Sequence, residues 1–106
     1  MPVSTHAGSD VGPLTLDHFS ALCGDRFAVL DPGFDGLWAD LVEAQPLGEA
    51  GFNGRQPFSL LFNGPAAPVL PQRTYRLAHA RLPELDIFLV PIGADAVCAR
   101  YQAVFG

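Results

Sequence analysis

The sequence predicts a mainly β protein, organised as one small antiparallel barrel or sandwich of about six strands with one short N-terminal helix. The chain of 106 residues is long enough for one hydrophobic core and leaves little for a second. Its 11 glycines and 10 prolines favour many tight turns over long helices. Short apolar or alternating segments recur between those turns, which is typical of small all-β domains.

The first 13 residues differ in composition from the rest of the chain. They are rich in Gly, Ser, Thr and Pro and have no periodicity, so we expect a flexible or partner-ordered arm. Residues 14–106 are expected to form the single β domain. The arm lacks the basic and apolar runs of a secretory signal. This predicts a cytoplasmic protein, or one exported as part of an assembly without a signal peptide.

A short helix is expected directly after the arm. Thr15 can cap its N-terminus and Gly24 can end it. Four side chains fall on one stripe of this helix, namely Leu16, Phe19, Leu22 and Cys23. We therefore expect the helix to plug one end of a sheet.

The most apolar segment, residues 57–62, lies near the middle of the chain and is followed by Asn63 and Gly64. It is too short for a helix and is bounded by turn residues, so we expect a strand in the middle of the fold, covered on both faces. Residues 85–92 form the second most apolar strand. Pro91 interrupts it and cannot donate to a ladder, which predicts an edge or a bulge at this position.

Alternating side chains predict the inner faces of the other strands. In residues 37–44, the face that contains Leu41 and Glu43 is mostly apolar, and Trp38 is expected over the other face at a sheet edge. Inward residues elsewhere are Phe27 and Val29 in the first strand, Tyr75 and Leu77 in residues 73–79, and Tyr101, Ala103 and Phe105 near the C-terminus.

Glycine and proline mark the linking segments. We expect a loop at residues 45–55, a turn at residues 80–83, and a turn at Gly93 and Asp95. In the proline-rich crossing at residues 65–71, Val69 and Leu70 are expected to tuck under the sheet. One core is predicted to contain Phe58, Leu60, Phe62, Leu77, Leu89 and Phe105.

Five segments in this order resemble a family of short bacterial proteins of unassigned function. They are residues 57–62 (PFSLLF), 70–72 (LPQ), 74–77 (TYRL), 88–93 (FLVPIG) and 100–105 (RYQAVF). The resemblance covers residues 14–106 and implies the fold, and it brings no catalytic residues. Relatives are often encoded beside tail-collar-like or tail-fibre-like proteins, which implies a partner of that kind. Arg73 stands where such sequences tend to have a glycine, and Cys98 stands in place of a glycine-like turn. These two departures affect the details of local turns and not the fold class.

The charge of the chain disfavours several classes of partner. Net charge is -5, and six scattered arginines are the only lysine or arginine residues. Binding to a phosphate backbone or to an anionic membrane surface needs a clustered basic face, so we expect neither nucleic acid nor membrane as a partner. The longest apolar run, residues 87–92, is far short of a membrane span.

Histidine and cysteine residues form no metal-binding or catalytic pattern. His6, His18 and His79 are widely separated, so we expect no zinc site and no cofactor. Cys98 could be combined with His79 and Asp86 as nucleophile, base and orienting group, but no neighbouring residue marks its thiol as activated. Packed thiols are the preferred interpretation of Cys98 and of Cys23, both expected to be buried and free.

Acidic residues gather around the predicted hairpin of residues 31–43. Asp31, Asp35, Asp40 and Glu43 do not supply the converging oxygens of a calcium site, so a solvated acidic edge is preferred. Arg76 and Arg100 lie at outward positions and could pair with Asp86 across the sheet.

These observations favour a non-catalytic structural or protein-interaction module over an enzyme. The expected contacts are made by the arm, which contains Val3, and by strand edges at Trp38 and Pro91. The expected partners are other protein chains, through self-association or binding of a tail-collar-like or tail-fibre-like protein. The alternative is a small ligand-binding barrel or a minor enzyme, with Tyr75 or Arg100 as a polar anchor.

Overall fold

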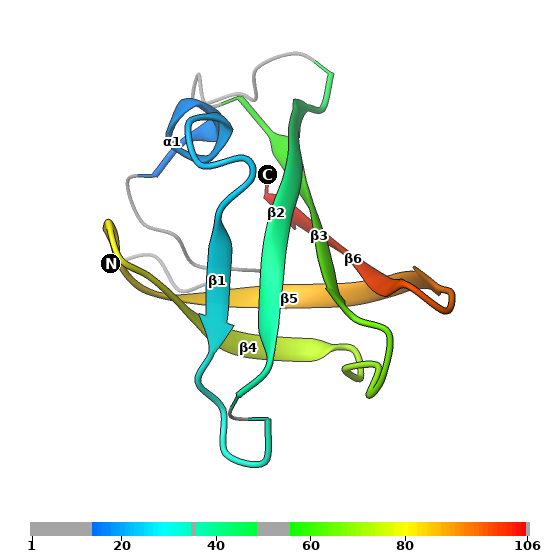
Figure 1. Ribbon diagram of the computed structural model, residues 1–106. Helices are drawn as coiled ribbons and strands as arrows, with labels where there is room; N and C mark the ends of the chain where they lie inside the picture. Colours follow the sequence, from blue (N-terminus) through cyan, green and yellow to red (C-terminus); the bar gives the residue numbers. More distant parts are fainter. Residues whose placement is uncertain (1–13, 35, 49–55, 106) are drawn as a thin grey trace.

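The computed structural model describes residues 14–34, 36–48 and 56–105. They form a closed antiparallel barrel of six strands with one short helix, which decides between the two predicted architectures in favour of the barrel (Figure 1). The order around the barrel is β1-β2-β3-β6-β5-β4. The helix is α1 (Leu16–Ser20), and the strands are β1 (Arg26–Val29), β2 (Trp38–Pro46), β3 (Phe58–Pro65), β4 (Arg73–His79), β5 (Leu82–Ala94) and β6 (Cys98–Phe105).

Strand β3 has the central place that its apolar sequence predicts, because it pairs with β2 on one side and with β6 on the other. The expectation that both of its faces are covered is wrong. Its side chains alternate between buried and half-buried, with Phe58, Leu60 and Phe62 inside and Leu61 half-buried outside. A closed barrel has one interior, so a strand in its wall buries a single face.

Two expectations for β2 are corrected by the structure. Trp38 does not lie at a sheet edge, because β2 has β1 on one side and β3 on the other. Glu43 does not share the inner face with Leu41, because a bulge between them shifts the register. The extra residue reverses the alternation, so that Glu43 is exposed and Ala44 packs against the core.

The helix closes one end of the barrel, as predicted. Thr15 is its N-cap, and the buried Phe19 ring lies 5.8 Å from the ring of Phe58 and 6.0 Å from that of Phe105. Leu22 is also buried. Cys23 is exposed, contrary to expectation, because the helix ends at Ser20 and the turn that follows directs this residue outward.

The other end is closed by the crossing from β3 to β4. Leu70 is buried there and its N–H donates to the Tyr101 hydroxyl at 2.8 Å, while the Tyr75 hydroxyl donates to the Pro71 carbonyl. Only half of the prediction for this segment is right, because Val69 stays exposed. The crossing is required because β3 and β4, although consecutive in sequence, are not neighbours in the barrel.

Strand lengths differ from prediction at several places. β2 continues to Pro46 into the expected loop, and β5 begins at Leu82 inside one expected turn and continues to Ala94, past the turn expected at Gly93. Pro91 lies at a bulge, as predicted, since the register between β5 and β6 shifts between Pro91 and Gly93. The six predicted core residues and the predicted inner faces of β1, β4 and β6 are buried. No described helix is long and apolar enough to cross a membrane.

Candidate functional site

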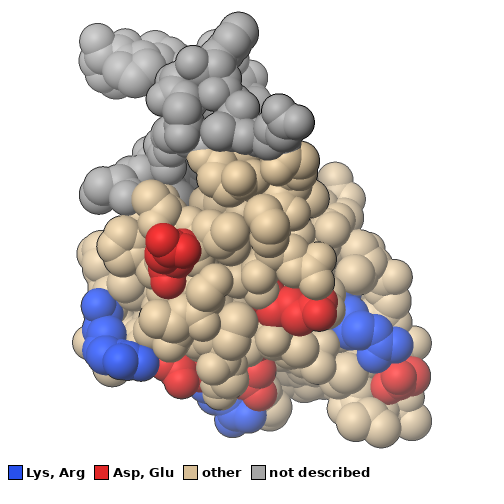
Figure 2. Space-filling model, turned by 90° about the horizontal axis from the view of Figure 1, so that it is seen from above, with Lys and Arg blue, Asp and Glu red and all other residues tan. Residues whose placement is uncertain are grey.

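Ion pairs cover much of the outer wall. Each described arginine contacts a carboxylate, and Figure 2 shows basic and acidic side chains beside one another. The pairs are Arg26–Asp40 at 2.7 Å, Arg73–Asp31 at 3.0 Å, Arg76–Asp86 at 3.1 Å, Arg81–Asp25 at 2.9 Å and Arg100–Asp95 at 3.2 Å. The predicted Arg76 pair is confirmed, whereas Arg100 pairs with Asp95 instead of Asp86. Such exposed pairs contribute about 0–1 kcal/mol each.

The predicted acidic edge is not a separate surface. Asp31 pairs with Arg73 and also accepts the main-chain N–H of Arg76 at 2.7 Å, and Asp40 pairs with Arg26. Asp35 lies outside the described residues. Asp31 therefore helps to join β1 to β4, and Asp40 links β2 to β1.

His79 belongs to a cluster that sequence reasoning missed. Its side chain is 6% exposed, Nδ1 accepts the Arg81 main-chain N–H at 3.0 Å, and Nε2–H donates to Asp25 at 2.9 Å. The hydrogen bond from His79, followed by that from Arg81, lowers the pKa of Asp25. The cluster joins the start of β1 to the turn between β4 and β5, which is a structural task.

The considered catalytic arrangement of Cys98, His79 and Asp86 is not assembled. Cys98 is half-buried with its sulfur 3.4 Å from an Arg100 nitrogen, His79 contacts Asp25, and Asp86 contacts Arg76. His18 contacts Thr15 at the helix cap. Within the described part of the chain, no three or more His, Cys, Asp or Glu side chains gather as metal ligands.

The barrel interior is filled by apolar side chains and by the buried rings of Tyr75 and Tyr101. Tyr75 and Tyr101 place their hydroxyls on the crossing at the barrel end, so neither offers a free anchor to an internal ligand. Burial, the largest cause, raises the pKa of Tyr75. Neither tyrosine hydroxyl is therefore free to anchor a small ligand inside the barrel.

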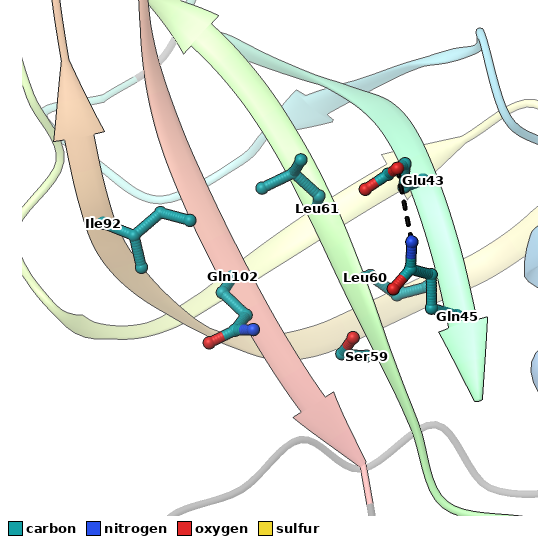
Figure 3. A pocket seen from close by; sticks show the side chains of 7 residues that line it. All are labelled: Glu43, Gln45, Ser59, Leu60, Leu61, Ile92 and Gln102. Carbon is teal, nitrogen blue, oxygen red and sulfur yellow. Dashed lines mark hydrogen bonds between the residues drawn. The ribbon is translucent and has the colours of Figure 1, made fainter. Parts of the chain in front are cut away.

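One shallow hollow lies on the outer wall, across β2, β3, β6 and β5 (Figure 3). Its volume is about 200 Å³, below the roughly 300–1,000 Å³ of ordinary ligand sites. Glu43 and Gln45 hydrogen-bond to each other at 3.3 Å along one side. Leu61, Ile92 and Gln102 contribute to the rest of the lining.

A more distinctive surface lies at the end of the barrel away from α1. We call it the apolar end and define it as residues 65–69 and 94–97. These two segments flank the start of β6, because Pro65 pairs with Cys98 and Ala94 pairs with Ala99. Val97 is 84% exposed and Val69 is 45% exposed. Asp95 is the one charged residue of the apolar end, and Arg100 pairs with it.

Both segments of the apolar end are held by hydrogen bonds. Asp95 accepts the main-chain N–H groups of Val97 at 2.8 Å and of Cys98 at 3.0 Å. These bonds, that of Cys98 first, together with Arg100, lower the pKa of Asp95. Leu70, next to Val69, is held by the Tyr101 hydroxyl. Val97 thus lies on a turn that hydrogen bonds order, and Val69 directly precedes an anchored residue.

The sequence-predicted interaction residues are dispersed. Trp38 is half-buried on the outer wall, where the Arg26 guanidinium lies 4.3 Å from its ring. Pro91 is half-buried in β5, and Val3 lies outside the described residues. Sequence reasoning missed Val97, although its place two residues after the turn-forming Asp95 was an available signal.

Comparison with curated proteins and with solved structures finds no match to this chain. A family described as "Domain of unknown function (DUF6916)" matches residues 14–105, which is nearly the whole barrel and its helix. The predicted resemblance to a family of unassigned function agrees with this match, and the chain belongs to that family.

Proposed function

We propose that this protein is a non-catalytic protein-interaction module that binds other protein chains through the apolar end. The observation that carries the proposal is the exposure of Val97 and Val69 on two loops that hydrogen bonds hold in place. Exposed apolar groups gain free energy when a partner covers them. Because the loops are already ordered, binding costs little conformational entropy.

The expected contacts through sheet edges at Trp38 and Pro91 are replaced in this proposal. Trp38 is flanked by strands on both sides, and Pro91 pairs with Tyr101 of β6. Binding by side chains of the apolar end needs no free strand edge. Trp38 is a secondary anchor in this proposal, because it is only half-buried on the outer wall.

A non-catalytic role is supported by how the polar groups are used. The described arginines pair with carboxylates, and the Tyr75 and Tyr101 hydroxyls bond to the main chain. Catalysis needs several reactive groups that converge on one substrate position. The alternative, a small ligand-binding barrel or minor enzyme, would have to use a site such as the shallow hollow of about 200 Å³, which is below the size of ordinary ligand sites.

The proposed partner is a second copy of the chain or a subunit of a larger assembly. An accessory or subunit role in a tail-fibre-like or filamentous assembly follows from the resemblance stated above. Such assemblies join rigid domains through small apolar contacts that repeat, and one contact of this kind is weak when it stands alone.

The experiment compares Val97→Asp with Val104→Asp. Both valines are exposed and both changes add one negative charge, but Val104 lies on the outer wall of β6 away from the apolar end. Sedimentation velocity from micromolar to near-millimolar protein, together with capture from source cells, measures binding. We expect Val97→Asp to weaken binding at least tenfold and Val104→Asp to leave it unchanged. A wild-type protein that stays monomeric and retains no Val97-dependent partner would refute the proposal.

A further inference from the structure

The hollow on the outer wall combines side chains from four neighbouring strands, β2, β3, β6 and β5 (Figure 3). In one row across these strands, Glu43 lies opposite Leu61, and Leu61 lies opposite Gln102. In the next row, Gln45 lies opposite Ser59. The short Ser59 side chain leaves space between its longer neighbours, so the wall is recessed at this place.

Two β-bulges direct side chains to the two sides of the hollow. The bulge between Leu41 and Glu43 turns Glu43 to the outer face of β2. The bulge between Pro91 and Gly93 leaves Ile92 of β5 without a counterpart on β6, and Ile92 is 52% exposed. Bulges re-aim side chains and are frequent next to functional sites. A carboxylate and an apolar side chain therefore flank the same hollow from opposite sides.

Glu43 brings a negative charge that no described residue neutralises. Its carboxylate accepts a hydrogen bond from the Gln45 amide at 3.3 Å. Apart from Glu43 and Asp17, each carboxylate side chain in the described part of the protein pairs with an arginine. Arg100, two residues before Gln102 on β6, donates to Asp95 through both terminal nitrogens at 3.2 Å. Charge complementarity at the hollow therefore favours a cation.

The lining suits the side chain of an arginine. The volume of about 200 Å³ is small for a drug-sized ligand, whereas one side chain needs less room. Leu61 and Ile92 offer apolar surface to the methylene groups, and Glu43 can accept from the guanidinium. The planar guanidinium has five N–H donors, so it can also reach the amide oxygens of Gln45 and Gln102. The compact ammonium of lysine matches this spread of acceptors less well.

We propose that the hollow binds an arginine side chain that a partner protein chain presents. The methylene groups lie on Leu61 and Ile92, and the guanidinium pairs with Glu43. This contact goes beyond the proposed function, because the hollow contains no residue of the apolar end. The Val97→Asp variant should therefore not weaken binding at the hollow, which lets the two proposals fail separately.

The test is a nuclear magnetic resonance titration of the full chain at constant ionic strength. The probe is a blocked peptide with one arginine between glycines, added to roughly 20 mM because a single side chain supplies weak affinity. We expect saturating shifts of the Gln45 and Gln102 side-chain amides and of the Leu61 main-chain amide. Matched peptides replace the arginine by lysine or by citrulline, which keeps the shape and loses the charge. The citrulline peptide should bind at least about fivefold more weakly.

Variants of the protein test the two sides of the hollow. Glu43→Gln keeps the size of the side chain and should weaken binding of the arginine peptide at least about fivefold. Asp17→Asn is the matched control, because it removes the same charge from another carboxylate without an arginine partner, outside the lining of the hollow. Its binding should equal that of the wild type. Ile92→Ser removes the apolar side and should also weaken binding.

Four outcomes overturn the proposal. They are the absence of saturating shifts in the wild type, equal binding of the citrulline or the lysine peptide, unchanged binding by Glu43→Gln, and equal weakening by Asp17→Asn. Arg55, outside the described residues, provides a further check. Binding that appears only in Arg55→Gln would also overturn the proposal, because the hollow would then hold an arginine of its own chain.

Discussion

At the scale of single residues, aspartates in the loops serve main-chain groups more than solvent. Asp31 accepts the N–H of Arg76, and Asp95 accepts those of Val97 and Cys98. Aspartate is suited to this task because its short side chain reaches the main chain a few residues away or across a narrow gap. The geometry of two regions, the β1–β4 closure and the apolar end, therefore depends on individual carboxylates.

Asp95→Asn should make the stability of the protein less dependent on pH. The N–H of Cys98, then that of Val97 and the Arg100 side chain, lower the pKa of Asp95 in the folded state. A lowered pKa stabilises the fold above the unfolded value of about 3.9, and this contribution is lost as the pH falls through the folded value. Urea melts should show a deficit for Asp95→Asn at neutral pH that shrinks as the pH falls below the unfolded value of about 3.9. A deficit that is constant with pH would contradict this account.

At the scale of elements, the shortest strand decides how the barrel closes. β1 pairs with β4 only at Ala28–Ala78 and Val29–Leu77 among the described residues. Asp31 continues the contact beyond the end of β1 through its bonds to Arg76 and Arg73. The Phe34 ring packs on Tyr75 at 5.6 Å next to it. The Asp31 side chain thus provides the contact to β4 beyond the last residue of β1.

Asp31→Ala should destabilise the protein by about 0.5–1.5 kcal/mol, because the Arg76 N–H loses its acceptor. The Asp31 side chain also pairs with Arg73, so the truncation removes two contacts. Asp31→Asn is the matched control, since its amide oxygen can still accept this hydrogen bond. Urea melts measure both. If the two variants lost equal stability, the charge of Asp31 would matter more than its role as an acceptor.

At the scale of the whole molecule, one apolar interior holds the six strands together. Phe62 is fully buried on β3, and its ring meets that of Phe27 edge-on at 5.7 Å. Helix α1 and the 66–72 crossing seal the two ends. Such a barrel is expected to unfold as a single cooperative unit.

Phe62→Ala should cost about 3–5 kcal/mol, because it leaves a cavity in the middle of this interior. Val104→Ala, at a half-exposed position on the outer wall, should cost less than about 1 kcal/mol. Urea unfolding followed by fluorescence and by circular dichroism compares the variants and tests whether the transitions coincide. A loss below about 1 kcal/mol for Phe62→Ala would contradict the central position of β3 in the core.

Local patterns predicted most of the elements and their inner faces. The residues predicted to face inward in β4 and β6 are buried, namely Tyr75, Leu77, Tyr101, Ala103 and Phe105. Phe19 and Leu22, predicted on the apolar stripe after the Thr15 cap, are buried too. Glu43 was assigned to the wrong face because a bulge reverses the alternation and leaves no clear signal in the residues. The apolar end was missed because its two segments are adjacent only through their pairing with β6.

The sequence by itself therefore determined that this protein is a small, mainly β domain with one short helix, with specified inner faces and a central strand at residues 57–62. Alternation and turn residues act over a few positions, so they can be recognised without knowing the neighbours of a strand. The tertiary structure alone decided that the sheet closes and that Trp38 lies in the wall. It also decided that the segments of Val69 and Val97 both flank the start of β6 at one end of the barrel. These outcomes depend on contacts such as Ala28 with Ala78, which form only when all six inner faces are buried together.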